Sequence, residues 1–165
     1  MTSERAIALG ITGPILRSTG LPWDLRKAEP YSVYDRIKFD IPWRPDLQGD
    51  VFDRFWMRLS EMYQSARIIE QCLEQMPKGG LVLNPDLPKT LRVENGEAYI
   101  RYEGTKGEYG VYAMSKGGNK PYRMKLRSPS FCNLSALREM VIGSYVADAI
   151  IILGSLDIVL GEVDK

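Results

Sequence analysis

The chain has 165 residues, a length typical of one compact domain, and its 22 Lys and Arg residues nearly balance its 21 Asp and Glu residues. A net charge of +1 gives no field that would hold a nucleic acid, so we expect no nucleic-acid partner. The absence of histidine removes the commonest general base, and two cysteines are too few for a disulfide framework and lack metal-site spacing.

The first predicted element is a short helix over residues 2–9, capped by Thr2 or Ser3 and ended by Gly10. Between Gly10 and Gly49, five prolines and four glycines exclude long helices and strands. Apolar and aromatic residues are interleaved among these breakers, so we predict a packed loop rather than a disordered one.

The clearest periodic pattern runs from Asp50 to Met76, where apolar residues recur at steps of three and four. It predicts an amphipathic helix roughly 40 Å long, at about 1.5 Å per residue, which Pro77 ends. The helix carries an aromatic stripe of Phe52, Phe55, Trp56 and Tyr63. We interpret the stripe as core, and the alternative is a groove that holds an apolar tail.

Three short strands and a last helix are predicted after a loop over residues 81–95. The strands, expected near 98–103, 109–114 and 122–126 with turns at 104–107 and 116–119, form an antiparallel meander. The helix is expected from about Leu134 to Leu153, with Asn133 or Ser135 as its N-cap and Gly154 at its end. The tail after it is apolar, so we expect it to be tucked into a protein interior. We therefore predict a single α+β domain over residues 1–165, in which the long amphipathic helix and the C-terminal helix pack with a small antiparallel sheet.

Several segments, ordered along nearly the whole chain, together resemble one family. Those in the first half are Thr12-Gly13-Pro14-Ile15-Leu16-Arg17, Trp23-Asp24-Leu25-Arg26-Lys27, Pro30-Tyr31, Phe39-Asp40-Ile41-Pro42, Gly49-Asp50, Asp53-Arg54, Arg58 and Glu61-Met62. Those in the second half are Lys106-Gly107-Glu108, Pro121-Tyr122-Arg123, Arg127, Pro129–Phe131, Asn133-Leu134 and Asp157–Asp164. By these segments the chain resembles the C-terminal part of the D-type (49 kDa) subunit of respiratory NADH:quinone oxidoreductases (complex I), which is related to the large subunit of nickel–iron hydrogenases.

The resemblance implies a quinone cavity and no metal. The two C-terminal cysteines that bind metal in the hydrogenases align with Val159 and Glu162, so no thiolate site can form here. The resemblance assigns four residues to the deep end of the cavity: Asp157, Val159, Glu162 and Lys165. The alternative is a solvated surface C-terminus, and no residue of this chain is expected to be catalytic or to bind metal.

Four loop charges are candidates for supporting the cavity or contacting another subunit, through ion pairs: Arg17, Asp24, Arg26 and Lys27. The alternative for them is solvation at the surface, where a single ion pair contributes about 0–1 kcal/mol. Arg123, Lys125 and Arg127 alternate and so share one strand face, which we expect to be solvated, with an acidic partner surface as the alternative.

The resemblance further implies that electrons pass from NADH through FMN and iron–sulfur clusters of partner subunits to quinone, coupled to proton translocation, and that the chain alone is inactive. The expected partners are an iron–sulfur subunit of B type, a C-type subunit, a membrane subunit of H type, and a separate or missing N-terminal half of the D-type subunit. We expect a peripheral location on the cytoplasmic face of the inner membrane, or the matrix side in mitochondria. Two alternatives stay open: a non-catalytic assembly fragment, and a hydrogenase-related subunit without metal.

Overall fold

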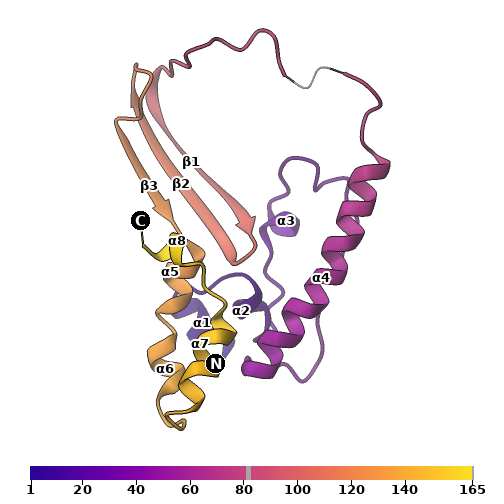
Figure 1. The fold of residues 1–165 in the computed structure, drawn as a ribbon, viewed down its shortest axis with the longest axis vertical. Helices are drawn as coiled ribbons and strands as arrows, with labels where there is room; N and C mark the ends of the chain where they lie inside the picture. Colours follow the sequence, from indigo (N-terminus) through magenta and orange to yellow (C-terminus); the bar gives the residue numbers. More distant parts are fainter. Residues whose placement is uncertain (81–82, 165) are drawn as a thin grey trace.

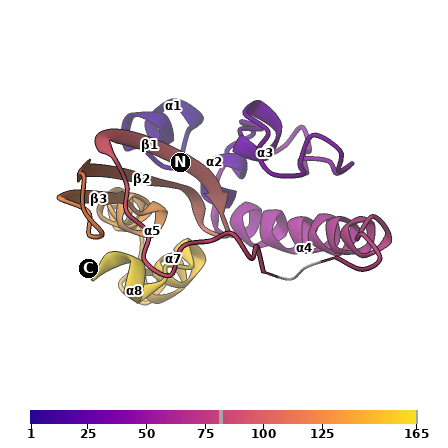
Figure 2. The ribbon, with the colours of Figure 1, turned by 90° about the horizontal axis from the view of Figure 1, so that it is seen from above.

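The computed structural model describes residues 1–80 and 83–164 and has the predicted α+β arrangement (Figure 1). The described elements are, in chain order, α1 (Ser3–Ala8), α2 (Pro14–Arg17), α3 (Leu25–Ala28), α4 (Val51–Glu74), β1 (Asn95–Gly104), β2 (Gly107–Lys116), β3 (Arg123–Arg127), α5 (Pro129–Leu134), α6 (Leu137–Val141), α7 (Asp148–Leu156) and α8 (Leu160–Val163). The sheet and α4 lie on opposite sides of the molecule, and the short helices other than α3 gather at one end (Figures 1 and 2).

The core joins the two ends of the chain. Ala6, Ile11 and Ile15 pack in one buried cluster with Ala136 and Leu156, which come from the last third of the sequence. The prediction of a tucked-in tail is therefore confirmed for Leu156, whereas Leu160, four residues later, is largely exposed. The described part of the chain contains no helix that is both long and apolar enough to cross a membrane.

The N-terminal third follows the sequence prediction. Thr2 caps α1 by accepting a hydrogen bond from the backbone N–H of Arg5. The segment from Gly10 to Gly49 contains only the four-residue helices α2 and α3, and it is packed, with Leu25, Ile37 and Phe39 buried. Pro14 begins α2, where the missing N–H of proline removes no helical hydrogen bond.

Helix α4 was correctly predicted, but its aromatic stripe was not. A capping box of Asp50 and Asp53 begins the helix, and the 24 residues end before Pro77. Contrary to the expectation of core, Phe52, Phe55 and Tyr63 are 58%, 60% and 69% exposed. The side of the helix that faces the rest of the chain is mostly polar, and it buries Asp53 and Arg54 together with Met57.

The sheet has the predicted meander order β1-β2-β3, and all pairs are antiparallel. The first turn closes between Gly104 and Gly107, and its tip packs tightly against the loop before α2. Gly107 has a φ of +129°, and a Cβ added there would lie 2.5 Å from Oγ1 of Thr12. The tip therefore requires glycine for both its backbone conformation and its close contact.

The single C-terminal helix predicted over residues 134–153 is wrong: the segment forms α5, α6 and α7. Ile142 has an extended backbone and Gly143 a φ of +86°, which ends α6. Asn133 does not cap a helix. Its buried amide accepts from the backbone N–H of Thr12 at 3.3 Å and donates to the carbonyl of Lys106 at 3.0 Å. Gly154 lies inside α7, which continues to Leu156.

Candidate functional site

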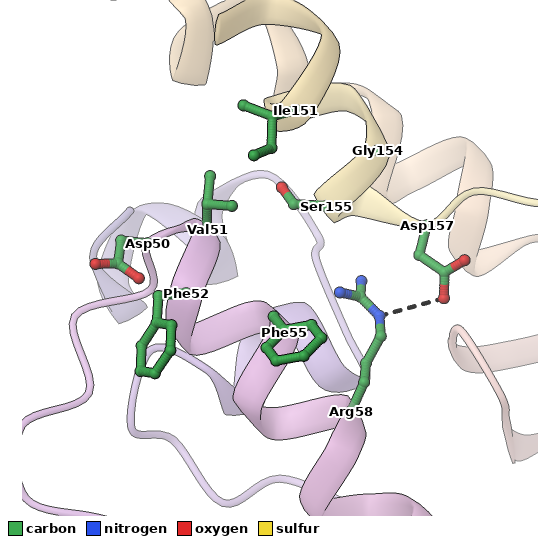
Figure 3. Close-up of a pocket in the computed structure, with 9 residues that line it drawn as sticks. All are labelled: Asp50, Val51, Phe52, Phe55, Arg58, Ile151, Gly154, Ser155 and Asp157. Carbon is green, nitrogen blue, oxygen red and sulfur yellow. Dashed lines mark ion pairs between the residues drawn. The ribbon is translucent and has the colours of Figure 1, made fainter.

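Three distant segments meet at Asp157. This residue follows α7 in a left-handed conformation, with φ +53°, and its side chain is 42% exposed. Its carboxylate pairs with Nε of Arg58 on α4 at 3.2 Å (Figure 3). It also pairs with Lys106 of the β1–β2 turn. Burial lowers the pKa of Arg58, and the charge of Asp157 opposes that shift. Asp157 is therefore held by two cations from two other parts of the fold.

A groove of about 820 Å³ opens beside this cluster (Figure 3). Its apolar walls come from the start of α4 and from α7: Val51, Phe52, Phe55 and Ile151, with Gly154 between. Its polar lining is Asp50, Arg58, Ser155 and Asp157. The groove thus combines apolar walls with a charged, hydrogen-bonding end, an arrangement suited to a ligand that has a polar head and an apolar body.

Arg58 and Asp157 also line a second cavity, of about 410 Å³. Its further charged lining residues are Arg17, Arg26, Glu61 and Glu103. The structure therefore brings two of the predicted loop cations, Arg17 and Arg26, to a cavity that Asp157 also lines.

Arg17 is the centre of a buried ion-pair network. It is 2% exposed, and its guanidinium lies 2.6 Å from Glu61, 2.7 Å from Glu103 and 3.6 Å from Asp24. Nη1 also donates to the carbonyl of Trp23 at 3.0 Å. Burial lowers the pKa of Arg17, but the three carboxylates outweigh it, so that its pKa is raised. A buried charge of this kind is tolerated because its donors are satisfied.

Three carboxylates share two guanidinium groups in this network. Asp24 caps α3 and pairs with Arg26 at 2.6 Å. Burial raises the pKa of Asp24, but Arg26 and Arg17 outweigh it and the pKa is lowered. Glu103 shares Arg17 with Asp24 and Glu61, and burial, with the charge of Asp24, leaves its pKa raised although Arg17 opposes the shift. Lys27 lies apart from these ion pairs, with Nζ 4.3 Å from the ring centroid of Phe39.

The other cavity candidates of the C-terminal segment meet α5. The Glu162 carboxylate accepts from Ser130 at the start of α5, at 2.6 Å from its hydroxyl and 3.2 Å from its backbone N–H. The backbone N–H of Val159 donates to the same hydroxyl at 3.2 Å. Lys165 lies outside the described residues. The structure therefore ties Val159 and Glu162 to Ser130, and Asp157 to Arg58 and Lys106.

Sequence reasoning did not assign a role to four residues of this site: Arg58, Glu61, Glu103 and Lys106. Arg58, Glu61 and Lys106 stand inside the segments that carry the family resemblance, so a signal was present. Glu103 had none, because it pairs with a residue 86 positions earlier in the chain.

The three basic residues that alternate along β3 differ in exposure. Arg123 and Lys125 are exposed, as expected. Arg127 is half-buried and donates to the carbonyl of Gly10 at 2.6 Å. Within residues 1–80 and 83–164, no three Cys, Asp or Glu side chains gather as they would around a metal ion.

The chain is similar in sequence to one family of known proteins. The sequence matches the family described as respiratory-chain NADH dehydrogenase, 49 kDa subunit, over residues 1–90 and 86–165. It is 50% identical over 164 residues to the D subunit of the NADH-quinone oxidoreductase of Desulforamulus reducens, a match that covers 99% of this chain and 44% of that protein. It is also 50% identical over 172 residues to the D 1 subunit of the same enzyme in Roseiflexus sp.. That match covers 100% of this chain and 45% of the relative. The chain thus spans less than half the length of these curated relatives.

Proposed function

Because the chain belongs to the family of the 49 kDa subunit of respiratory-chain NADH dehydrogenase, we propose that it forms part of the quinone-binding cavity of an NADH:quinone oxidoreductase. The observation that carries this proposal is the position of Asp157. Its carboxylate, held by Arg58 and Lys106, lies at the polar end of a groove whose walls are apolar.

The chemistry of the groove suits a quinone. A quinone headgroup presents two carbonyl oxygens that accept hydrogen bonds, and its tail is apolar. Arg58 supplies donors at the polar end of the groove, and Lys106 contacts the same carboxylate oxygen of Asp157, Oδ2, while Phe52, Phe55 and Ile151 supply apolar contact for a ring or tail. Reduction to the quinol takes up two electrons and two protons, so a carboxylate beside the carbonyl oxygens is placed to help organise proton delivery.

In this proposal the chain contributes shape, orientation and electrostatics. FMN and iron–sulfur clusters, bound by partner subunits, carry the electrons from NADH, and the reaction is coupled to proton translocation. The chain alone is then inactive with NADH and quinone.

The remaining candidates have supporting roles in the proposal. Glu162, through Ser130, fixes the segment after Asp157, and Val159 lies in the same segment. Lys165 is proposed to add a cation at the deep end of the cavity. Arg17, Asp24 and Arg26 support the second cavity through their buried ion pairs, and Lys27 stays a candidate for contact with another subunit.

The proposed assembly contains an iron–sulfur subunit of B type, a C-type subunit, a membrane subunit of H type and the other half of a D-type subunit. It is peripheral, on the cytoplasmic face of the inner membrane or the mitochondrial matrix side. The competing function is that of a non-catalytic assembly fragment of the same complex.

The test is Asp157→Asn in the assembled complex. We expect quinone reductase activity to fall about tenfold or more, which corresponds to a loss of about 1.4 kcal/mol or more of transition-state stabilisation. NADH oxidation by an artificial acceptor that reacts at the flavin should stay unchanged. Asp35→Asn, at an exposed aspartate paired with Arg36, is the matched control. Full quinone activity in the Asp157 variant would remove Asp157 from the site and favour the assembly function.

A further inference from the structure

Helix α4 carries an apolar seam with a strict seven-residue repeat. The seam consists of Phe52, Phe55, Leu59, Met62, Ala66, Ile69 and Leu73, which alternate at steps of three and four. All seven are exposed, and the six larger ones have exposed fractions between 42% and 67%. The seam therefore runs along nearly the whole helix without cover from the described residues.

The opposite face of α4 contacts the rest of the chain largely through polar groups, although it also buries Met57. Glu61 pairs with Arg17 at 2.6 Å, Gln64 accepts from the backbone N–H of Asp40 at 3.0 Å, and Gln71 exchanges two hydrogen bonds with the backbone of Lys38. A surface helix normally buries its apolar face and exposes its polar one. In α4 the polar side chains Glu61, Gln64 and Gln71 face the rest of the chain, whereas the seven apolar residues of the seam face solvent.

The spacing of the seam specifies what kind of element can cover it. A repeat of 3.5 residues per turn keeps apolar side chains in line along a helix, so that a second helix crossing at about 20° can pack against its whole length. A strand or an irregular loop has no matching period. The seam is about 30 Å long, since its 22 residues rise by about 1.5 Å each, and it therefore calls for a helix of similar length.

We propose that the seam of α4 binds a helix from the polypeptide that corresponds to the part of the D-type subunit that this chain does not span. The matched region is only 44% of the Desulforamulus reducens protein and 45% of the Roseiflexus protein, so more than half of each relative is available to supply it. This inference rests on the proposed function, because it takes the partner from the same kind of complex.

The seam also continues into the candidate site. Its first two residues, Phe52 and Phe55, line the groove that ends at Asp157 (Figure 3). A helix bound along α4 would therefore add a wall to that groove and reduce its exposure to water. The site described above is then incomplete until the partner is bound.

The test is co-expression of the tagged 165-residue chain with the part of the Desulforamulus reducens relative that lies outside its match to this chain, followed by affinity purification. The seam variant is Ile69→Glu with Leu73→Glu, at two exposed positions remote from the groove. The control is Glu74→Lys, an exposed residue of the same helix outside the seam. We expect recovery of the partner to fall at least tenfold for the seam variant and to be unchanged for the control.

Equal recovery with the seam variant and the unmodified chain would overturn the proposal, as would no recovery with either. Self-association of the chain that the seam variant abolishes, without any partner bound, would replace the partner by a second copy. Circular dichroism of each purified chain checks that the variants keep their helices. Because this binding assay contains no quinone and leaves Asp157 unchanged, its outcome is independent of the Asp157→Asn activity test.

Discussion

Replacing Arg17 by Met would test whether the buried ion-pair network stabilises the fold. The guanidinium is 2% exposed and contacts Glu61, Glu103 and Asp24, so its removal leaves three partly or fully buried carboxylates with only Arg26 among them. Removing one partner of a buried ion pair costs about 3–5 kcal/mol. This cost is a large fraction of the free energy of unfolding of a typical protein, which is about 5–15 kcal/mol.

The assay is unfolding in urea, monitored by circular dichroism. With a denaturant slope of about 1–3 kcal/mol per molar urea, the expected loss lowers the midpoint by about 1 M or more. Arg67→Met is the control, because the pair of Arg67 with Asp40 is exposed and should contribute no more than about 1 kcal/mol. Adding Glu103→Gln to the Arg17 variant should recover part of the loss by removing one uncompensated charge. Equal midpoints for the Arg17 and Arg67 variants would refute the reasoning.

Two further predictions concern local features of the fold. Burial raises the pKa of Asp53, but hydrogen bonds from the backbone of Gln48 and from Arg44 outweigh it and lower the pKa below its usual 3.8. The stabilisation that Asp53 gives to the fold is therefore fully present above pH 3.8 and is lost as the pH falls through its folded-state pKa. The difference in urea midpoint between the unmodified chain and the Asp53→Asn variant should accordingly shrink as the solution is acidified. A difference that stays constant would contradict this assignment. Gly107→Ala should destabilise the fold by about 1–3 kcal/mol, because Gly107 has a positive φ and lies in close contact with Thr12. Thermal unfolding measures the loss. Gly118→Ala is the control and should have little effect, since a Cβ there would meet only atoms at 3.9 Å.

The sequence predicted best the elements whose signals are local. The capping box of Asp50 and Asp53, the three-and-four spacing after it, and Pro77 define α4 without reference to the rest of the chain. The strands and the turn at 104–107 were predictable for the same reason. The C-terminal segment was predicted as one helix but forms three, because Gly143, with its positive φ, separates α6 from α7, and no glycine or proline marks the boundary between α5 and α6.

The site depended on long-range contacts that no local pattern reports. Resemblance to a family selected Asp157, Arg17 and Arg26, but the pairing of Arg17 with Glu103 joins residues 86 positions apart. The exposed aromatic stripe of α4 was misinterpreted for a related reason: periodicity identifies an apolar face, but does not tell whether this chain or another covers it.

The amide of Asn133 has a consequence for the order in which the chain folds. It joins the loop at Thr12 to a segment 121 residues later, and Ala6 packs in the same cluster as Leu156. Contacts between such distant residues form slowly, since long loops must close before any contact rewards them. During synthesis, α4 can form as soon as it leaves the ribosome, but the core cannot close until Leu156 has emerged. The surroundings of Asp157 are therefore expected to be the last part of the fold to form, and a nascent chain that stops before Leu156 would have its long helix but neither a complete core nor the site.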